Sequence, residues 1–303
     1  MNIRYLKHDE ISKLKWDKCV SQSFNGIAYA FSWYLDIVSY QWDALVMDDY
    51  KAIMPLTAKS GYGFSKIIQP NFAPQLGVFT SERLNVDLVN SFLNAIPDKF
   101  KSVNLNLNAF NKVSHKKFHI KQEISYELDL ILPYKTLFSK FSKEVKQHVK
   151  KSKDENVSVS KHLNLKDFLL LKKNNSDDPL TFEHMNILRR IIPFCTNHNI
   201  GETYGAYNDK NELVAGAFFM KSHQKAICLL AACSNEGKEI SAGYAIFNNY
   251  INEYAEKSLT FDFGSYQNTD KEFSGKGFNA VPVTYPKLKR SRFRWFFSLK
   301  KHN

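Results

Sequence analysis

The sequence predicts an α/β protein with two tandem domains, each built on a mixed, mostly antiparallel sheet flanked by helices. Two observations lead to this prediction. A chain of 303 residues is long for one hydrophobic core, because a domain holds roughly 150 residues. The order of elements also repeats, with helices first, antiparallel strands next, and a helix and a strand closing each half. We therefore expect domains at residues 1–130 and 131–286, followed by a tail at 287–303.

The first half is expected to form one compact unit. Apolar residues recur at helical spacing in its early segments. The alternation of Leu105 and Leu107 with asparagines predicts a half-buried strand. The loop from Gln69 to Gln75 must be irregular, because its prolines lack a backbone donor and disfavour helix before them. The expected elements are helices at 11–21, 31–40 and 84–95 and strands at 44–47, 52–58, 102–108 and 118–130.

The second half is expected to start with one long helix over residues 134–153. Its apolar residues fall on one side, and its lysines, among them Lys146 and Lys150, share another side. The next expected helices are 165–173, 180–197 and 242–257, and the expected strands are 202–207, 213–221, 226–232 and 259–263. The last two strands and the helix between them predict a βαβ unit. Asp262 ends its second strand, where open α/β sheets usually bind ligands.

Composition indicates a folded chain that attracts anions. Hydrophobic residues make up 44% of the sequence and the net charge is +12. No apolar run approaches the ~20 residues that a membrane-spanning helix needs. The N-terminus lacks the apolar core of a signal peptide, so we expect a cytoplasmic protein. The four cysteines form no CxxC pair and the histidines are scattered, so we expect buried structural thiols and no metal site.

The segment 287–303 combines basic and aromatic residues. It holds seven Lys or Arg residues, no acidic residue, and aromatic side chains such as Phe293 and Trp295. This composition is typical of a segment that rests in an anionic membrane interface. A simple basic tail is the alternative. The first interpretation predicts peripheral contact with the inner face of the membrane.

Three parts of the sequence, taken together and in order, match the pattern of a known family. They are residues 29–35, 54–56 and 69–77 in the first half, 141–151 in the linker helix, and 216–217, 262–265 and 273–285 in the second half. These segments resemble the Fem-type branch of the GNAT acyltransferase superfamily, in which two GNAT-like domains occur in one chain. The resemblance implies the same pair of α/β domains.

The resemblance implies an N-acyltransferase that moves an acyl or aminoacyl group to an amine in cell-envelope or surface-glycan biosynthesis. The donor would be an aminoacyl-tRNA or an acyl-CoA, the acceptor a small-molecule or lipid-linked amine, and no cofactor would be tightly bound. GNAT proteins hold the CoA pyrophosphate on a Q/R-x-x-G-x-G/A loop at a helix start. The segment 234–243 does not match this loop, and Glu236 and Glu239 would repel a pyrophosphate. This favours an aminoacyl-tRNA donor.

Aminolysis requires a neutral amine near an activated carbonyl and hydrogen-bond donors for the oxyanion that develops. Asp262 is the candidate catalytic residue that accepts a proton from the amine or orients it, and stabilisation of a turn is its alternative role. Lys146 and Lys150 are candidates for phosphate contacts, with a solvated helix face as the alternative. The other candidate substrate-binding residues, whose aromatic members could instead pack in the core, are Tyr29, Trp33, Tyr34, Gln69, Gln75, Ser265 and Tyr285.

Three alternative functions remain open at the level of sequence. The first is a CoA-dependent N-acetyltransferase with a degenerate pyrophosphate loop. The second is a catalytically inactive module that binds a glycan or a protein. The third, nucleic-acid binding without chemistry, rests on charge alone and predicts binding that collapses steeply with salt.

Overall fold

The structure is a computed structural model that describes residues 2–61, 64–175, 180–264 and 275–291. The chain divides into two compact units. The first unit holds the residues up to Glu123 together with the described residues from Thr284 on, and the second unit holds Ile124–Val283. The chain thus returns to the first unit after it has completed the second.

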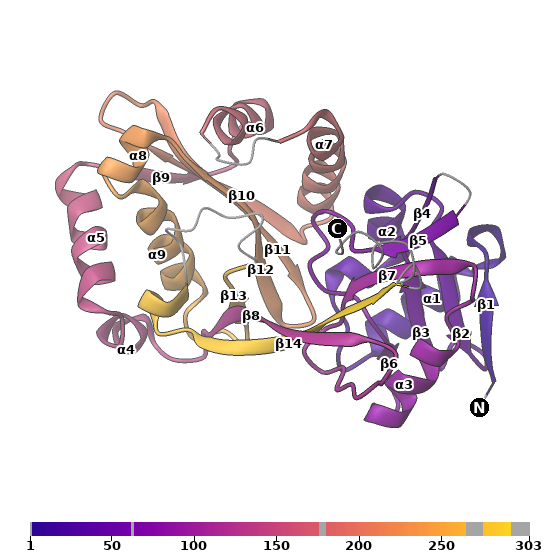
Figure 1. Ribbon diagram of the computed structural model, residues 1–303. Helices are drawn as coiled ribbons and strands as arrows, with labels where there is room; N and C mark the ends of the chain where they lie inside the picture. Colours follow the sequence, from indigo (N-terminus) through magenta and orange to yellow (C-terminus); the bar gives the residue numbers. More distant parts are fainter. Residues whose placement is uncertain (1, 62–63, 176–179, 265–274, 292–303) are drawn as a thin grey trace, which may run out of the picture. The chain divides into compact units, whose positions relative to one another are not determined.

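The described part of the first unit contains two sheets. One is fully antiparallel and has the order β1-β2-β3-β6. In the other, β4, β5, β7 and β14 follow one another, and β5 pairs with β7 in parallel. The elements, shown in Figure 1, are β1 (Ile3–Leu6), α1 (Lys13–Gln22), α2 (Ser32–Val38), β2 (Asp43–Met47), β3 (Ala52–Leu56), β4 (Ala58–Gly61), β5 (Phe64–Ile68), β6 (Phe79–Thr80), α3 (Val86–Asn94), β7 (Phe100–Asn106) and β14 (Val281–Ser291), which begins in the second unit.

Helix α3 shows how local sequence and packing agree in this unit. Asn85 precedes the helix, and its side chain accepts a hydrogen bond from the Leu88 backbone N–H at 2.9 Å. This satisfies one of the backbone donors that every helix start leaves unpaired. The apolar side of α3, including Phe92, is buried in a core cluster with strands β2, β3 and β7. Each such buried side chain contributes about 1.5–3 kcal/mol.

The second unit is built on one sheet with the order β8-β13-β12-β11-β10-β9. Its neighbours are antiparallel except for β12 and β13, which pair in parallel. The elements are β8 (His119–Asp129), which begins in the first unit, α4 (Tyr134–Ser139), α5 (Lys143–Asp154), β9 (Ser158–Lys161), α6 (Leu165–Asn174), α7 (Phe182–Asn197), β10 (Gly201–Tyr207), β11 (Leu213–Ser222), β12 (Lys225–Cys233), α8 (Asn235–Glu239), α9 (Ala242–Tyr254) and β13 (Thr260–Asp262).

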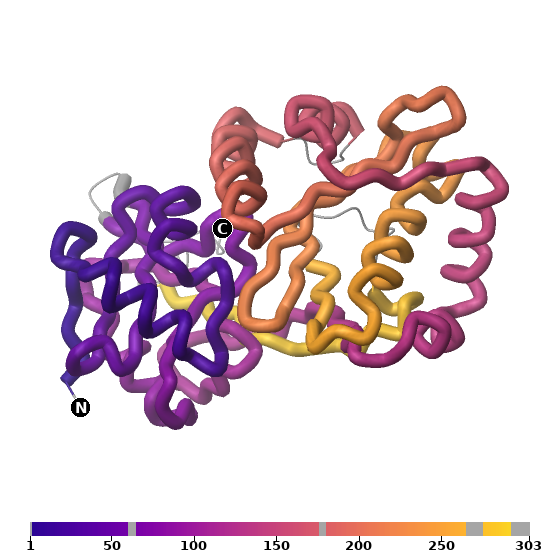
Figure 2. Tube along the Cα trace, turned by 180° about the vertical axis from the view of Figure 1, so that it is seen from behind, coloured from indigo at the N-terminus to yellow at the C-terminus, as the bar shows by residue number. Residues whose placement is uncertain are grey.

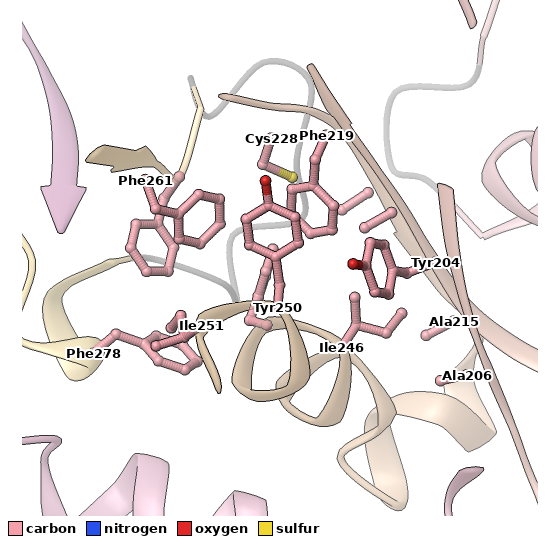
Figure 3. Close-up of a cluster of buried hydrophobic side chains, with 14 of the residues drawn as sticks. Tyr204, Ala206, Ala215, Phe219, Cys228, Ile246, Tyr250, Ile251, Phe261 and Phe278 are labelled. Carbon is pink, nitrogen blue, oxygen red and sulfur yellow. The ribbon is translucent and has the colours of Figure 1, made fainter. Parts of the chain in front are cut away.

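Helices cover both faces of this sheet. Helix α9 lies between α5 and strands β10, β11 and β12, while α6 and α7 lie on the opposite face (Figure 1, Figure 2). The core under α9 is aromatic (Figure 3). The rings of Phe219 and Tyr250 stack with centroids 4.0 Å apart, and Phe261 lies edge-on to Phe219 at 5.6 Å. This core fixes α9 on the sheet and therefore fixes the βαβ unit that α9 connects.

The α/β class with mostly antiparallel sheets flanked by helices is confirmed. The prediction of one helix over residues 134–153 is wrong, because the chain forms α4 and α5 instead. Ser142 causes the break: its side chain accepts a hydrogen bond from Val145 N at 3.2 Å and starts a new helix. Its own N–H donates to the Gly277 carbonyl at 2.8 Å. The expected apolar side of α5 is confirmed, since Val145 and Val149 are buried.

Candidate functional site

Among the described residues, the parallel pairing of the βαβ unit in the second unit ends well before the end of β12. Strands β12 and β13 pair in parallel from Lys225 opposite Thr260 to Ile227 opposite Asp262. Among the described residues the pairing ends there, although β12 continues to Cys233. The backbone groups of β12 beyond Ile227 that point away from β11 are therefore not bonded to β13.

A β-bulge lies just beyond the end of this pairing. Phe218 pairs with Leu230, and the next residue, Phe219, pairs with Cys228, so Leu229 is the extra residue on β12. A bulge bends its strand and changes the direction of nearby backbone groups, and bulges are frequent beside active sites. The part of β12 that does not pair with β13, from Cys228 to Cys233, is therefore a candidate set of backbone donors, and its residues are buried.

Asp262 is the last residue of β13 and of its pairing with β12. Its Oδ1 accepts hydrogen bonds from the Ser125 hydroxyl at 2.5 Å and from the Gly264 backbone N–H at 2.9 Å. Gly264 has φ +82°, in the left-handed region that a residue with a Cβ rarely adopts. The side chain of Asp262 and the glycine two residues later together form a tight turn at the end of β13.

The carboxylate of Asp262 lies in an unusual electrostatic environment. Asp262 is only 5% exposed. Burial raises the pKa of its carboxyl above the usual range for Asp. The nearby cation of Lys225 opposes this shift and the carboxylate of Glu127 adds to it. Lys225 and Glu127 themselves form an ion pair at 2.5 Å. A carboxyl with a raised pKa is a stronger base than an exposed one, which suits proton transfer.

The segment before α9 is anchored to the sheet and does not form a glycine-rich loop. Residues 235–239 form the short helix α8. A Cβ on Gly237 would collide with the carbonyl oxygen of Val214, so this glycine is required for close packing against β11. Asn208 also anchors α8, because its side chain donates a hydrogen bond to Glu236 Oε1 at 2.8 Å.

His148 of α5 covers the start of α9. Its Nδ1 lies 2.9 Å from the hydroxyl oxygen of Ser241, and its ring stacks on Tyr244 with centroids 4.1 Å apart and planes 5° apart. Ser241 is buried and has φ +61°, a conformation that costs energy for a residue other than glycine. These contacts were not predicted, because no local pattern links residues so far apart in the sequence.

The two lysines predicted on this helix lie on α5 as expected. Lys146 donates from Nζ to the Ser139 carbonyl at 2.6 Å and so caps the end of α4. Lys150 is exposed. Ser265, another predicted residue, lies outside the residues that the structure describes.

The remaining predicted residues lie in the first unit. Tyr29, Trp33 and Tyr34 are in contact, with ring centroids 5.5 Å apart for Tyr29 and Tyr34 and 5.2 Å apart for Trp33 and Tyr34. Both tyrosines are buried, whereas Trp33 is half-buried. The Tyr34 hydroxyl donates to the Phe72 carbonyl at 2.5 Å, which ties this cluster to the irregular loop at 69–75.

The side chain of Gln69 stabilises the same loop through two hydrogen bonds. Its Nε2 donates to the Ala73 carbonyl, and its Oε1 accepts from the Asn106 N–H at 2.8 Å. Gln75, at the end of the loop, is half-buried. Tyr285 is 5% exposed and lies on β14. The structure thus brings Tyr29, Trp33 and Tyr34 together beside the Gln69 loop, and it places Lys146, Lys150 and Asp262 in the second unit.

No protein-family model and no curated protein matches this sequence. Solved structures do match it in fold. The FemX crystal structure superposes with a TM-score of 0.64 at 13% identity, over 94% of this chain and 97% of that one. A conserved protein of unknown function from Bacteroides thetaiotaomicron gives 0.55 at 12% identity, over 92% of this chain and 97% of that one.

A third match is the C-terminal domain of an Agrobacterium fabrum protein assigned as a lysylphosphatidylglycerol synthetase. Its TM-score is 0.53 at 10% identity, and the match covers 92% of each chain. These similarities extend over nearly the whole chain. The expected Fem-like fold is therefore confirmed.

Two properties of the described residues bear on membranes and metals. None of the described helices has the length and apolar character needed to cross a bilayer. In the same part of the chain, no three His, Cys, Asp or Glu side chains are grouped closely enough to hold a metal ion.

Proposed function

We propose that this chain is an N-acyltransferase that transfers an aminoacyl group from an aminoacyl-tRNA to an amine in cell-envelope biosynthesis. The observation that carries the proposal is the bulged part of β12 that does not pair with β13, beside the Asp262 turn, within a Fem-like fold. The name of the Agrobacterium protein refers to an aminoacylated lipid, which supports an aminoacyl donor and an envelope acceptor.

The chemistry follows from the arrangement of these groups. The amine nitrogen of the acceptor forms a bond to the acyl carbon, and the ester bond to the tRNA ribose breaks with its oxygen as the leaving group. Backbone N–H groups on this part of β12 stabilise the negative charge that develops on the carbonyl oxygen. Asp262 orients the amine and takes its proton, a role for which its raised pKa suits it.

The choice of tRNA over CoA as donor is supported by the segment before α9. The resemblance to GNAT proteins would place the CoA pyrophosphate there, on exposed backbone N–H groups. Gly237 is instead packed against Val214, and Glu236 and Glu239 bring negative charge to the same segment. Pyrophosphate binding at this position would therefore be opposed both by packing and by charge.

We assign the contacts with the two substrates to separate sets of residues. Lys150, with Lys146 beside it on α5, contacts phosphates of the tRNA in the donor site. The cluster of Tyr29, Trp33 and Tyr34 with the Gln69–Gln75 loop contributes to the acceptor site. We place the enzyme in the cytoplasm. The basic and aromatic residues of segment 287–303 that follow β14, which lie outside the described residues, contact the inner face of the membrane and present the site to a lipid-linked amine.

The test is a transfer assay with the purified full chain. tRNA charged with radiolabelled amino acids is mixed with envelope precursors that carry a free amine, and label in the precursor is counted. In parallel, acetyl-CoA and aminoacyl-tRNA are compared in a thermal-shift experiment, because a specific ligand stabilises the folded state by mass action. We expect label transfer and stabilisation by aminoacyl-tRNA. Stabilisation and turnover with acetyl-CoA alone would overturn the choice of donor.

A further inference from the structure

The first unit contains a cavity of about 710 Å³ beside the last strand. Its walls come from three segments: Ser102–Asn104 of β7, residues 116–119, which lead into β8, and Lys289–Ser291 of β14. Lys289 lies opposite Asn104 in the antiparallel pairing of β14 with β7. The volume falls in the range of pockets that bind small molecules.

The lining of this cavity is basic. It holds five basic side chains and no acidic one: Lys116, Lys117, His119, Lys289 and Arg290. Basic side chains this close together repel one another unless an anion lies between them.

Neighbouring lysines show the usual way in which such repulsion is relieved. Lys121 and Lys287 both pair with Glu123, at 3.2 Å and 3.7 Å. Within the described part of the chain, the lining residues Lys116 and Lys117 form no such ion pair, and neither does Lys289. Among the described residues, these three lysines therefore bring positive charge to the cavity without a carboxylate partner, whereas Lys121 and Lys287 have one.

Three further observations support a ligand here. The Arg290 guanidinium lies 4.9 Å from the centroid of the Phe118 ring, a contact that holds the cation in place. Burial, followed by the charges of Lys117 and Arg290, lowers the pKa of His115, as a positive potential requires. Among the described residues the buried Asn104 Oδ1 has no hydrogen-bond partner, although nearly all buried acceptors have one.

We infer that this cavity binds a phosphorylated small molecule, whose phosphate oxygens contact Lys116, Lys117, Lys289 and Arg290. A hydroxyl or N–H group next to the phosphate donates to Asn104 Oδ1. A phosphate satisfies several cations at once, because it carries up to two charges and three acceptor oxygens. This inference does not depend on the proposed acyl transfer, since it concerns a separate set of residues and predicts binding without turnover.

The primary experiment is isothermal titration of the full chain with inorganic pyrophosphate at low ionic strength. We expect saturable binding that weakens as salt is added. The variants Lys117→Glu and Lys289→Glu should each weaken binding by roughly tenfold or more, because a hydrogen bond to a charged group is worth at least one decade of affinity. The matched control is Lys18→Glu, which makes the same charge change at an exposed position on α1 outside the lining. Its affinity should stay within roughly twofold of the parent.

Urea unfolding of each variant verifies that it is folded. An equal loss of affinity in all three variants would reduce the effect to overall charge and overturn the site. A second titration uses glycerol 3-phosphate, which adds hydroxyl donors. Asn104→Leu should weaken glycerol 3-phosphate binding and leave pyrophosphate binding unchanged, and an equal effect on both ligands would refute the contact with Asn104.

The phosphate could belong to a soluble molecule or to a lipid headgroup, and two arms separate these sources. If pyrophosphate binds, and Lys117→Glu and Lys289→Glu weaken this binding while Lys18→Glu does not, the site belongs to a soluble ligand. Binding only to vesicles that contain phosphatidic acid, with the same pattern, assigns it to a lipid headgroup. Failure of both, or tight binding of an unrelated RNA duplex that pyrophosphate does not displace, would overturn the inference.

Discussion

Replacing Asp262 by Asn separates the chemical role of its carboxylate from its structural role. An Asn Oδ1 can accept the same hydrogen bonds from the Ser125 hydroxyl and the Gly264 N–H, which lie 2.5 Å and 2.9 Å from Asp262 Oδ1. The turn should survive, and the free energy of unfolding should change by less than about 1 kcal/mol. Asp262→Ala removes the oxygen that accepts both hydrogen bonds and leaves two donors unpaired, which should cost about 2–6 kcal/mol at about 1–3 kcal/mol for each donor.

The stability difference between Asp262→Asn and the parent should also depend on pH. The folded-state pKa of Asp262 is raised, chiefly by burial, so the folded state binds this proton more tightly than the unfolded state does. The group therefore favours folding at low pH, and its contribution is lost as the pH rises through the raised pKa. Asn lacks this dependence, so Asp262→Asn should gain stability relative to the parent between acidic and neutral pH.

The assay combines urea unfolding, followed by circular dichroism, with the aminoacyl-transfer reaction. If Asp262 takes the proton of the amine, Asp262→Asn loses roughly 10²- to 10⁴-fold in kcat while its unfolding curve stays near that of the parent. Unchanged kcat in a folded Asp262→Asn enzyme would refute the catalytic role and leave the turn as the only one. A large loss of stability in Asp262→Asn would instead refute the hydrogen-bond argument.

Three further predictions concern the second unit and the thiols. Phe219→Ala should lose about 3–5 kcal/mol in urea unfolding, because the buried ring stacks on an aromatic core; a loss below about 1 kcal/mol would contradict that packing. Burial alone would raise the pKa of Glu202, but the Tyr254 hydrogen bond and two lysines lower it. Glu202→Gln should therefore cost about 1–3 kcal/mol at neutral pH. This difference should vanish as the pH falls through the lowered folded-state pKa, and a pH-independent difference would count against it. Burial raises the pKa of Cys19 to about 11 and of Cys195 to about 12, and Cys228 and Cys233 are also buried. Alkylation of the native protein should therefore be slow and should accelerate in denaturant. Rapid labelling of the native protein would be inconsistent with four buried thiols.

Much of the second unit could be predicted because its signals are local. The run from Leu213 to Lys221 and the run from Ala226 to Ala232 are apolar and bounded by polar turns, and both form buried strands. The end of the βαβ unit at Asp262 was placed correctly for the same reason. What the carboxylate contacts could not be predicted, since its partner Ser125 lies 137 residues earlier in the chain.

Elements that depend on distant pairing were missed. Strand β1 is short and half-exposed, and it is defined by its pairing with β2, where Ile3 lies opposite Met47. The basic segment after residue 286 was interpreted by its charge as the start of a tail. In the structure Leu288 is fully buried and the segment pairs with β7 as the end of β14. Alternation of Leu288 with Lys287 and Lys289 was the signal for a strand, and the density of charge concealed it.

Gly237 shows why a glycine in a loop before a helix is weak evidence for phosphate binding. Only a residue without a Cβ fits against the Val214 carbonyl, so the packing of α8 alone requires this glycine. The start of α9 is in turn covered by His148 and Ser241. A donor that needed exposed N–H groups at this position would first have to displace α8 from β11. The aminoacyl-tRNA that we propose as donor has no such requirement, because tRNA phosphates can bind to side chains, and Lys150 is exposed.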